Sequence, residues 1–117
     1  MMNQTYWNET IETLPRAELE AYQTHQLAVH LELAYQHSNY YHETFEKVKV
    51  RPADFNSLVD LKKFPFVDKK VERERQLVKP LLGDMTAVEE REVVFVSASS
   101  DSTGVPTLGD FRKRSYL

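Results

Sequence analysis

The feature that most constrains the fold of this chain is a run of four apolar residues, Val-Val-Phe-Val, at positions 93–96. Its continuous apolar character is typical of a strand buried on both faces, as in the interior of an α/β sheet. Such a strand needs hydrogen-bonding neighbours on both edges. The chain offers few candidates, of which residues 107–116 are one. We therefore expect either a fragment of a larger α/β domain or a chain whose partner strands come from another molecule.

The first 78 residues are predicted to be mainly helical. Residues 16–37 are good helix formers that follow Pro15, and their apolar residues recur at i, i+4 and i+7. This spacing predicts a long amphipathic helix. Its apolar side is expected to carry Leu27, Leu31, Leu33 and Ala34.

Three polar residues predict where further helices begin. Ser38 can cap a short helix over residues 40–48. Ser57 with Asp60 resembles a capping box that opens a helical turn. Asp68 can cap a third helix over residues 69–76, and its charged sequence KKVERER is interpreted as a solvated face. The inward side chains of the 40–48 helix are predicted to be Tyr41, Phe45 and Val48.

Composition excludes several classes of function. The net charge of −3, without a long basic stripe, argues against a general nucleic-acid-binding protein. The absence of cysteine excludes a disulfide framework and cysteine-based zinc sites, and it fits a reducing compartment. The first twelve residues do not resemble a signal peptide, and no apolar run approaches membrane-spanning length. We expect a cytoplasmic protein that binds neither nucleic acid nor membranes.

A segment rich in hydroxyl groups, VSASSDSTGVPT at residues 96–107, directly follows the apolar run. Its hydroxyls and the backbone N–H groups near Gly104 could bind phosphate oxygens. It does not fit the G-x-x-x-x-G-K-[ST] pattern of nucleotide-binding P-loops. On spacing alone, both a phosphate-binding loop and an ordinary polar turn stay open.

The order of residues in this segment resembles the phosphate loop of adenylate-forming enzymes, [ST]-S-G-[ST]-T-G-x-P-T. Other segments, in the same order along the chain, resemble the phenylacetate–CoA ligase branch of that superfamily. Within the helical region, they are Tyr6-Trp7-Asn8, residues 16–20, residues 33–38 with Tyr40, Tyr41 and Phe45, and residues 58–66. Near the end, Phe111 followed by Arg112-Lys113-Arg114 matches a basic stretch of the family.

This resemblance implies an α/β fold and an ATP-dependent reaction. The chain would be the N-terminal part of the large domain, with residues 1–78 helical and residues 79–117 holding a strand, the phosphate loop and a second strand. Such enzymes join an aromatic carboxylic acid to coenzyme A, with ATP and Mg²⁺. The resemblance assigns ATP phosphate binding to Ser99, Ser100, Asp101, Ser102, Thr103, Gly104, Pro106 and Thr107. It assigns no catalytic residue and no metal ligand within the chain.

Two positions depart from the family pattern. Asp101 stands where the family has glycine, and Val105 stands where many members have lysine. A carboxylate beside a phosphate repels it, so we expect the loop to bind ATP weakly. The isolated chain is expected to be inactive. The alternative is a truncated or decayed interaction module, which would associate with itself or a homologue through its unpaired strands.

Three other groups of residues carry weaker signals. The histidines lack the i, i+3 or i, i+4 spacing of a helical metal pair. The aromatic residues are interpreted as helix-packing core rather than a base-stacking platform, because no Lys or Arg is interleaved with them. Arg112-Lys113-Arg114 could contact phosphate or coenzyme A, or lie in solvent. The histidines are His25, His30, His37 and His42, and the aromatic residues are Tyr6, Trp7, Tyr35, Tyr40, Tyr41 and Phe45.

Overall fold

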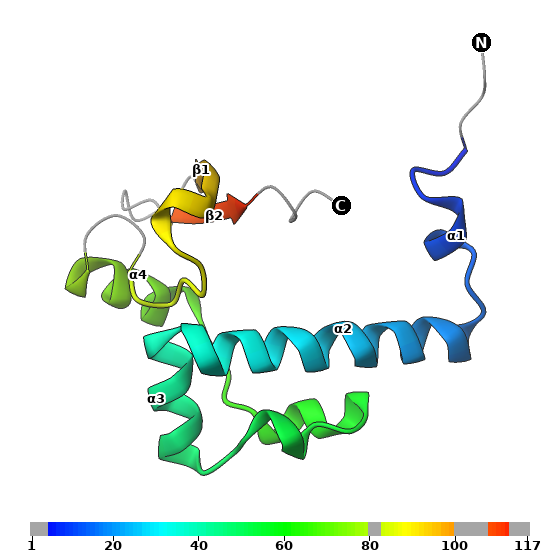
Figure 1. Ribbon diagram of the computed structural model, residues 1–117, viewed down its shortest axis with the longest axis horizontal. Coiled ribbons are helices and arrows are strands. Elements are labelled where there is room, and N and C mark those ends of the chain that lie inside the picture. Colours follow the sequence, from blue (N-terminus) through cyan, green and yellow to red (C-terminus); the bar gives the residue numbers. More distant parts are fainter. Residues whose placement is uncertain (1–4, 80–82, 100–107, 113–117) are drawn as a thin grey trace.

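The structure is a computed structural model that describes residues 5–79, 83–99 and 108–112. Helices occupy the described part up to residue 79, and a two-stranded antiparallel ribbon follows (Figure 1). The expected order, a helical region followed by a strand, is confirmed. The elements are α1 (Glu9–Glu12), α2 (Arg16–His37), α3 (Asn39–Val48), η1 (Pro52–Asp54), η2 (Leu58–Lys63), α4 (Lys69–Val78), η3 (Glu90–Glu92), β1 (Val93–Ala98) and β2 (Leu108–Arg112).

The long helix α2 is the axis around which the other elements are arranged (Figure 1). It spans the predicted residues, and Pro15 precedes it, with the N–H of Leu19 donating to the Pro15 carbonyl. Helix α3 turns sharply away from the C-terminal end of α2, and α1 lies near the opposite end (Figure 1). None of the helices in the described part combines the length and apolar character needed to span a bilayer.

The hydrophobic core lies where α2, α3 and the 3₁₀ helices η1 and η2 meet. Leu27 and Leu31 pack against it as expected, but Tyr35 continues their stripe. Leu33 follows Leu31 by two residues, about 200° around the helix, and therefore faces away. The buried residues are Phe45, Val50, Phe55 and Phe64, with Leu27, Ala28, Leu31, Tyr35, Tyr41 and Leu58 packed around them.

The C-terminal end of α3 explains a wrong prediction. Val48 was expected in the core but is 50% exposed. Lys49 adopts a left-handed conformation with φ of 57°, and the N–H of Val50 donates to the Phe45 carbonyl at 3.0 Å. With the N–H of Lys49 donating to the Glu46 carbonyl, this is a Schellman motif. The reversal places Val50 in the core beside Phe45, where Val48 had been predicted.

Strand β1 begins at the predicted apolar run and pairs with β2, the second strand expected within residues 107–116. Burial on both faces, however, is not found within this chain. Val94, Phe95 and Val96 are between 42% and 59% exposed. The reason is that, among the described residues, β2 is the single strand that pairs with β1. The apolar faces of β1 are therefore uncovered here.

The turn before η2 depends on a carboxylate. Asp60 pairs with Lys63 at 2.8 Å and accepts the N–H groups of Asn56 and Ser57 at 2.9 and 3.1 Å. The ion pair with Lys63, together with these backbone N–H groups, lowers the pKa of Asp60 to about 2. The reciprocal carboxylate contact expected from the Ser57 capping box is thus present.

We predict that Asp60→Asn reduces the acid sensitivity of the fold. A folded-state pKa below the ordinary value of 3.8 means that the ionised carboxylate stabilises the fold above about pH 4. That contribution is lost as the pH falls toward 2. The difference in unfolding free energy between wild type and Asp60→Asn should therefore shrink between pH 4 and pH 2 in urea titrations. A constant difference across this range would contradict the prediction.

Candidate phosphate-binding site

The structure describes the first residue of the predicted phosphate loop and the residue that directly follows the loop. Ser99 follows β1, and Leu108, the first residue after the loop, begins β2. Ala98 and Leu108 are opposite each other in the antiparallel register, so the two ends of the segment are adjacent. The other predicted residues lie outside the described part of the chain: Ser100, Asp101, Ser102, Thr103, Gly104, Pro106 and Thr107.

Helix α4 contacts Leu108, the residue that directly follows the predicted loop. Asp68 caps this helix as predicted, its side chain accepting the N–H of Val71 at 2.9 Å. Gln76 reaches β2 with both ends of its amide. Its Nε2 donates to the Leu108 carbonyl at 2.8 Å, and its Oε1 accepts the Leu108 N–H at 3.4 Å. The residue that follows the loop is therefore attached to α4.

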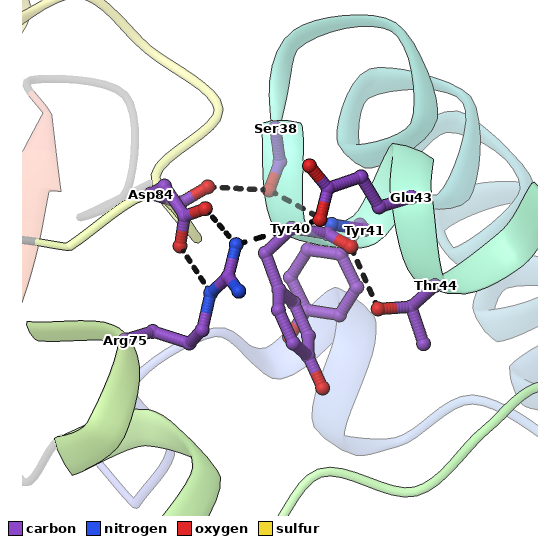
Figure 2. Close-up of polar contacts among 7 residues, drawn as sticks. All are labelled: Ser38, Tyr40, Tyr41, Glu43, Thr44, Arg75 and Asp84. Atoms are coloured by element: carbon purple, nitrogen blue, oxygen red, sulfur yellow. Dashed lines mark hydrogen bonds and ion pairs between the residues drawn. The ribbon is translucent and has the colours of Figure 1, made fainter. Parts of the chain in front are cut away.

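The neighbouring residue, Arg75, joins α4 to the start of α3. Its guanidinium donates through Nε to Asp84 Oδ1 at 2.7 Å and forms a second bond from Nη2 to Asp84 Oδ2 (Figure 2). It also lies over the ring of Tyr40, 5.2 Å from the ring centroid. Glu43 adds an ion pair at 3.6 Å. The interpretation of α4 as a solvated helix is therefore wrong at Arg75, whose side chain is 25% exposed.

The backbone of Asp84 completes this junction. Its carbonyl accepts the N–H of Tyr40 at 3.1 Å and the hydroxyl of Ser38 at 3.3 Å (Figure 2). Ser38 also caps α3 as predicted, accepting the N–H of Tyr41, and it is almost fully buried. Gly83 allows the close approach, since its φ is 72° and a β carbon there would lie 3.1 Å from the Arg75 carbonyl oxygen.

The positive charge of Arg75 is stabilised by its partner. The hydrogen bonds to Asp84 raise the pKa of Arg75 above its ordinary value, outweighing the effect of burial. A bidentate arginine–carboxylate pair of this kind restricts both distance and orientation. Arg75 therefore fixes α4 against the segment before β1 and against α3.

We predict that Arg75→Met destabilises the fold by about 2 kcal/mol, because it leaves Asp84 without its charged donor. Arg75→Lys keeps the charge but loses the bidentate geometry, so an intermediate loss is expected. Lys70→Met is the control, because Lys70 is exposed and its ion pair with Glu74 is long, at 3.9 Å. Urea unfolding monitored by circular dichroism measures all three. Equal losses for Arg75→Met and Lys70→Met would contradict the prediction.

The other candidate groups do not join this site. His42 stacks on Tyr35 with a centroid distance of 4.5 Å, and its Nδ1 lies 2.9 Å from the Tyr35 carbonyl oxygen. Within the described ranges, no group of three or more His, Cys, Asp or Glu residues could hold a metal ion. In the basic run, the side chain of Arg112 is outside the description, as are Lys113 and Arg114.

The aromatic residues divide into two sets. Tyr35 and Tyr41 each pack against Phe45 in the core region, and the buried Tyr40 packs edge-to-face on Tyr41, as expected. Tyr6 and Trp7 were expected there too, but both are exposed. They precede α1, which lies near the end of α2 opposite α3 and is too distant to reach the core (Figure 1).

A cavity of about 370 Å³ lies between the C-terminal end of α2 and the segment that leads into β1. Sequence reasoning did not find it, because its walls come from positions more than fifty residues apart. Glu89 and Glu92 contribute two carboxylates, which disfavour phosphate. Among the described residues, the lining does not include Ser99, the one described residue of the predicted phosphate loop. Its lining residues are Leu33, His37, Ala87, Val88, Glu89 and Glu92.

The fold of the chain matches part of the fold of an adenylate-forming acyl-CoA ligase. A solved structure of 2-hydroxyisobutyryl-CoA ligase, in complex with 2-HIB-AMP and CoA, matches with a TM-score of 0.82 and 29% sequence identity. This match covers 95% of the chain and 24% of that ligase. The same enzyme in its postadenylation state with 2-HIB-AMP gives a TM-score of 0.82 at 28% identity.

Most of the chain is similar in sequence to curated phenylacetate-coenzyme A ligases. Phenylacetate-coenzyme A ligase of Escherichia coli (strain K12) is 39% identical over 100 residues, which are 86% of this chain and 22% of the ligase. The Aromatoleum evansii ligase of the same name is 38% identical over 100 residues, with the same two shares. None of the known protein-family models matches the chain. The chain is thus related to the phenylacetate–CoA ligase family, over a segment that spans 22% of the length of these relatives.

Proposed function

We propose that this chain is the N-terminal portion of the adenylate-forming domain of a cytoplasmic ligase that joins an aromatic carboxylic acid to coenzyme A. The observation that carries the proposal is the 39% identity to the Escherichia coli phenylacetate-coenzyme A ligase over 100 residues. The hydroxyl-rich segment directly after β1 supports it. These matches do not favour the alternative of a non-catalytic interaction module.

The proposed reaction has two steps. A carboxylate oxygen of the acid attacks the α-phosphorus of ATP, and the bond to the leaving pyrophosphate breaks. The thiol of coenzyme A then attacks the acyl carbon, loses its proton and displaces AMP. Carboxylates are poor acylating agents, and adenylation supplies the leaving group.

In this proposal the chain contributes donors to the phosphates and no nucleophile. Ser99, Ser102 and Thr103 supply hydroxyls, and the backbone around Gly104 supplies N–H groups to the β- and γ-phosphates of ATP. Ser100, Pro106 and Thr107 complete the loop. Pre-placed donors that stabilise charge on a transferring phosphate account for most of the catalysis of such steps.

The proposal is tested by assaying the natural protein from its source cells for pyrophosphate release. We expect release to require both phenylacetate and ATP, and acyl-CoA to form only when coenzyme A is added. The 117-residue chain is the matched control, and we expect no turnover from it because it spans only 22% of such a ligase. If 2-hydroxyisobutyrate replaced phenylacetate as the better substrate, the acid class would be corrected. No release with any carboxylic acid would overturn the proposal.

A further inference from the structure

We propose that Gln76 is a positioning residue that sets the affinity of the phosphate loop for the triphosphate of ATP, an inference that rests on the proposed function. The side-chain amide of Gln76 pairs with both the carbonyl and the N–H of Leu108, at 2.8 and 3.4 Å. An amide that satisfies the donor and the acceptor of one residue fixes it as an adjacent strand would. Leu108 is the residue that directly follows the loop.

The residues that flank the loop, Ala98 and Leu108, meet at this point. Leu108 pairs with Ala98 in the β1–β2 register, and Ala98 precedes Ser99, the first loop residue. The ribbon therefore fixes the two ends relative to each other. Gln76 fixes the paired ends relative to α4.

Helix α4 is itself held in place by the residue beside Gln76. Successive residues of a helix point about 100° apart, so Arg75 and Gln76 can contact different elements. Arg75 binds Asp84 and covers Tyr40 of α3, whereas Gln76 binds β2 (Figure 2). Two neighbouring side chains thus connect the helical region to Leu108, the residue that directly follows the phosphate loop.

The consequence for binding follows from geometry. Phosphate-binding donors must lie within hydrogen-bond distance of the oxygens, and a displacement of about 1 Å can cost about 10²-fold in activity. Gln76 makes no contact with ATP in this proposal. It acts through Leu108, and its loss should weaken ATP binding without changing the sites for the acid or coenzyme A.

The test is Gln76→Met in the natural protein, because methionine keeps the length of the side chain but neither bonds the carbonyl nor strongly accepts the N–H. We expect the KM for ATP to rise about 10-fold. The KM values for the acid and coenzyme A should stay unchanged. Leu77→Met introduces the same residue at the next, exposed position and should leave all three constants unchanged. A uniform loss of kcat with an unchanged KM for ATP would overturn the proposal.

A second measurement reports the attachment without ATP. Hydrogen exchange of the Leu108 amide should be faster in Gln76→Met and unaffected in Leu77→Met, and unchanged exchange would overturn the proposal. Should Gln76→Met fail to fold, Gln76→Glu replaces it. That variant keeps an acceptor for the Leu108 N–H but sets a carboxylate oxygen against the carbonyl, and we expect the same rise in the KM for ATP.

The outcomes separate this inference from the proposed function. If the natural protein uses ATP and Gln76→Met leaves the KM for ATP unchanged, this inference alone fails. If neither the wild type nor Asp101→Gly binds ATP, the proposed function fails and the inference fails with it. Faster exchange at Leu108 together with a selective rise in the KM for ATP supports both.

Discussion

Phe45→Ala should destabilise the fold by about 3–5 kcal/mol, the largest stability effect that we expect from any single substitution in this chain. Phe45 is 2% exposed and is the centre of the core. Its ring is 5.2 Å from that of Phe64, in an edge-to-face arrangement, and 5.9 Å from that of Tyr41. Alanine would remove these contacts and leave a cavity between α3 and the 3₁₀ helices.

The loss is a large share of the stability of a typical domain, which is about 5–15 kcal/mol. We therefore expect Phe45→Ala to lower the urea midpoint severely or to prevent folding. Phe45→Leu, which retains most of the volume, should lose less. Val48→Ala is the matched control, because Val48 lies one turn later on α3 and is half-exposed. A loss below 1 kcal/mol for Phe45→Ala, measured by urea unfolding, would show that the core is not centred on this residue.

The local features of this fold could be predicted because they depend on residues close in sequence. Helix α2 spans the predicted residues, since propensity and a preceding proline act locally. Ser38 and Asp68 cap helices as expected, because a cap bonds an N–H only two or three residues away. The apolar run at 93–96 predicted a strand for the same reason, as its pattern is a property of adjacent residues.

The residues that connect the helical region to the loop could not be predicted in this way. Arg75 and Gln76 lie in a charged stretch that resembles a solvated helix, and hydropathy does not reveal which charges find a partner. Their partners are Asp84, nine residues on, and Leu108, thirty-two residues on. Gly83 before Asp84 was a usable signal, because a glycine at positive φ often allows two backbone segments to approach closely.

The prediction that β1 is buried on both faces was wrong for a different reason. The apolar pattern indicates that the sequence of β1 is suited to burial on both faces. The described part of this chain, however, provides β2 as a single neighbouring strand. The relatives are several times longer, since the chain spans 22% of the Escherichia coli ligase. An α/β pattern on an exposed strand is therefore consistent with a segment of a larger domain.

Asp101→Gly should tighten ATP binding by as much as about three orders of magnitude. This expectation rests on the proposed phosphate loop, in which the resemblance places Asp101 at the position of a family glycine. A carboxylate about 4 Å from a phosphate charge costs about 4 kcal/mol at an effective dielectric constant of 20. At 25 °C this corresponds to about a thousandfold in affinity. Titration calorimetry of the natural protein with ATP measures the change.

Asp101→Asn separates the two physical causes of the effect. Asparagine removes the negative charge but keeps a side chain, whereas glycine also restores access to positive φ. If repulsion dominates, Asn and Gly should tighten binding almost equally. If the backbone must approach the phosphate closely or adopt positive φ, only the glycine variant should tighten ATP binding. Unchanged affinity in both variants would contradict the hypothesis. If the variants bound ATP more weakly than the wild type in the presence of Mg²⁺, the effect would be opposite to the one expected. That result would mean that the Asp101 carboxylate attracts ATP through a cation instead of repelling it.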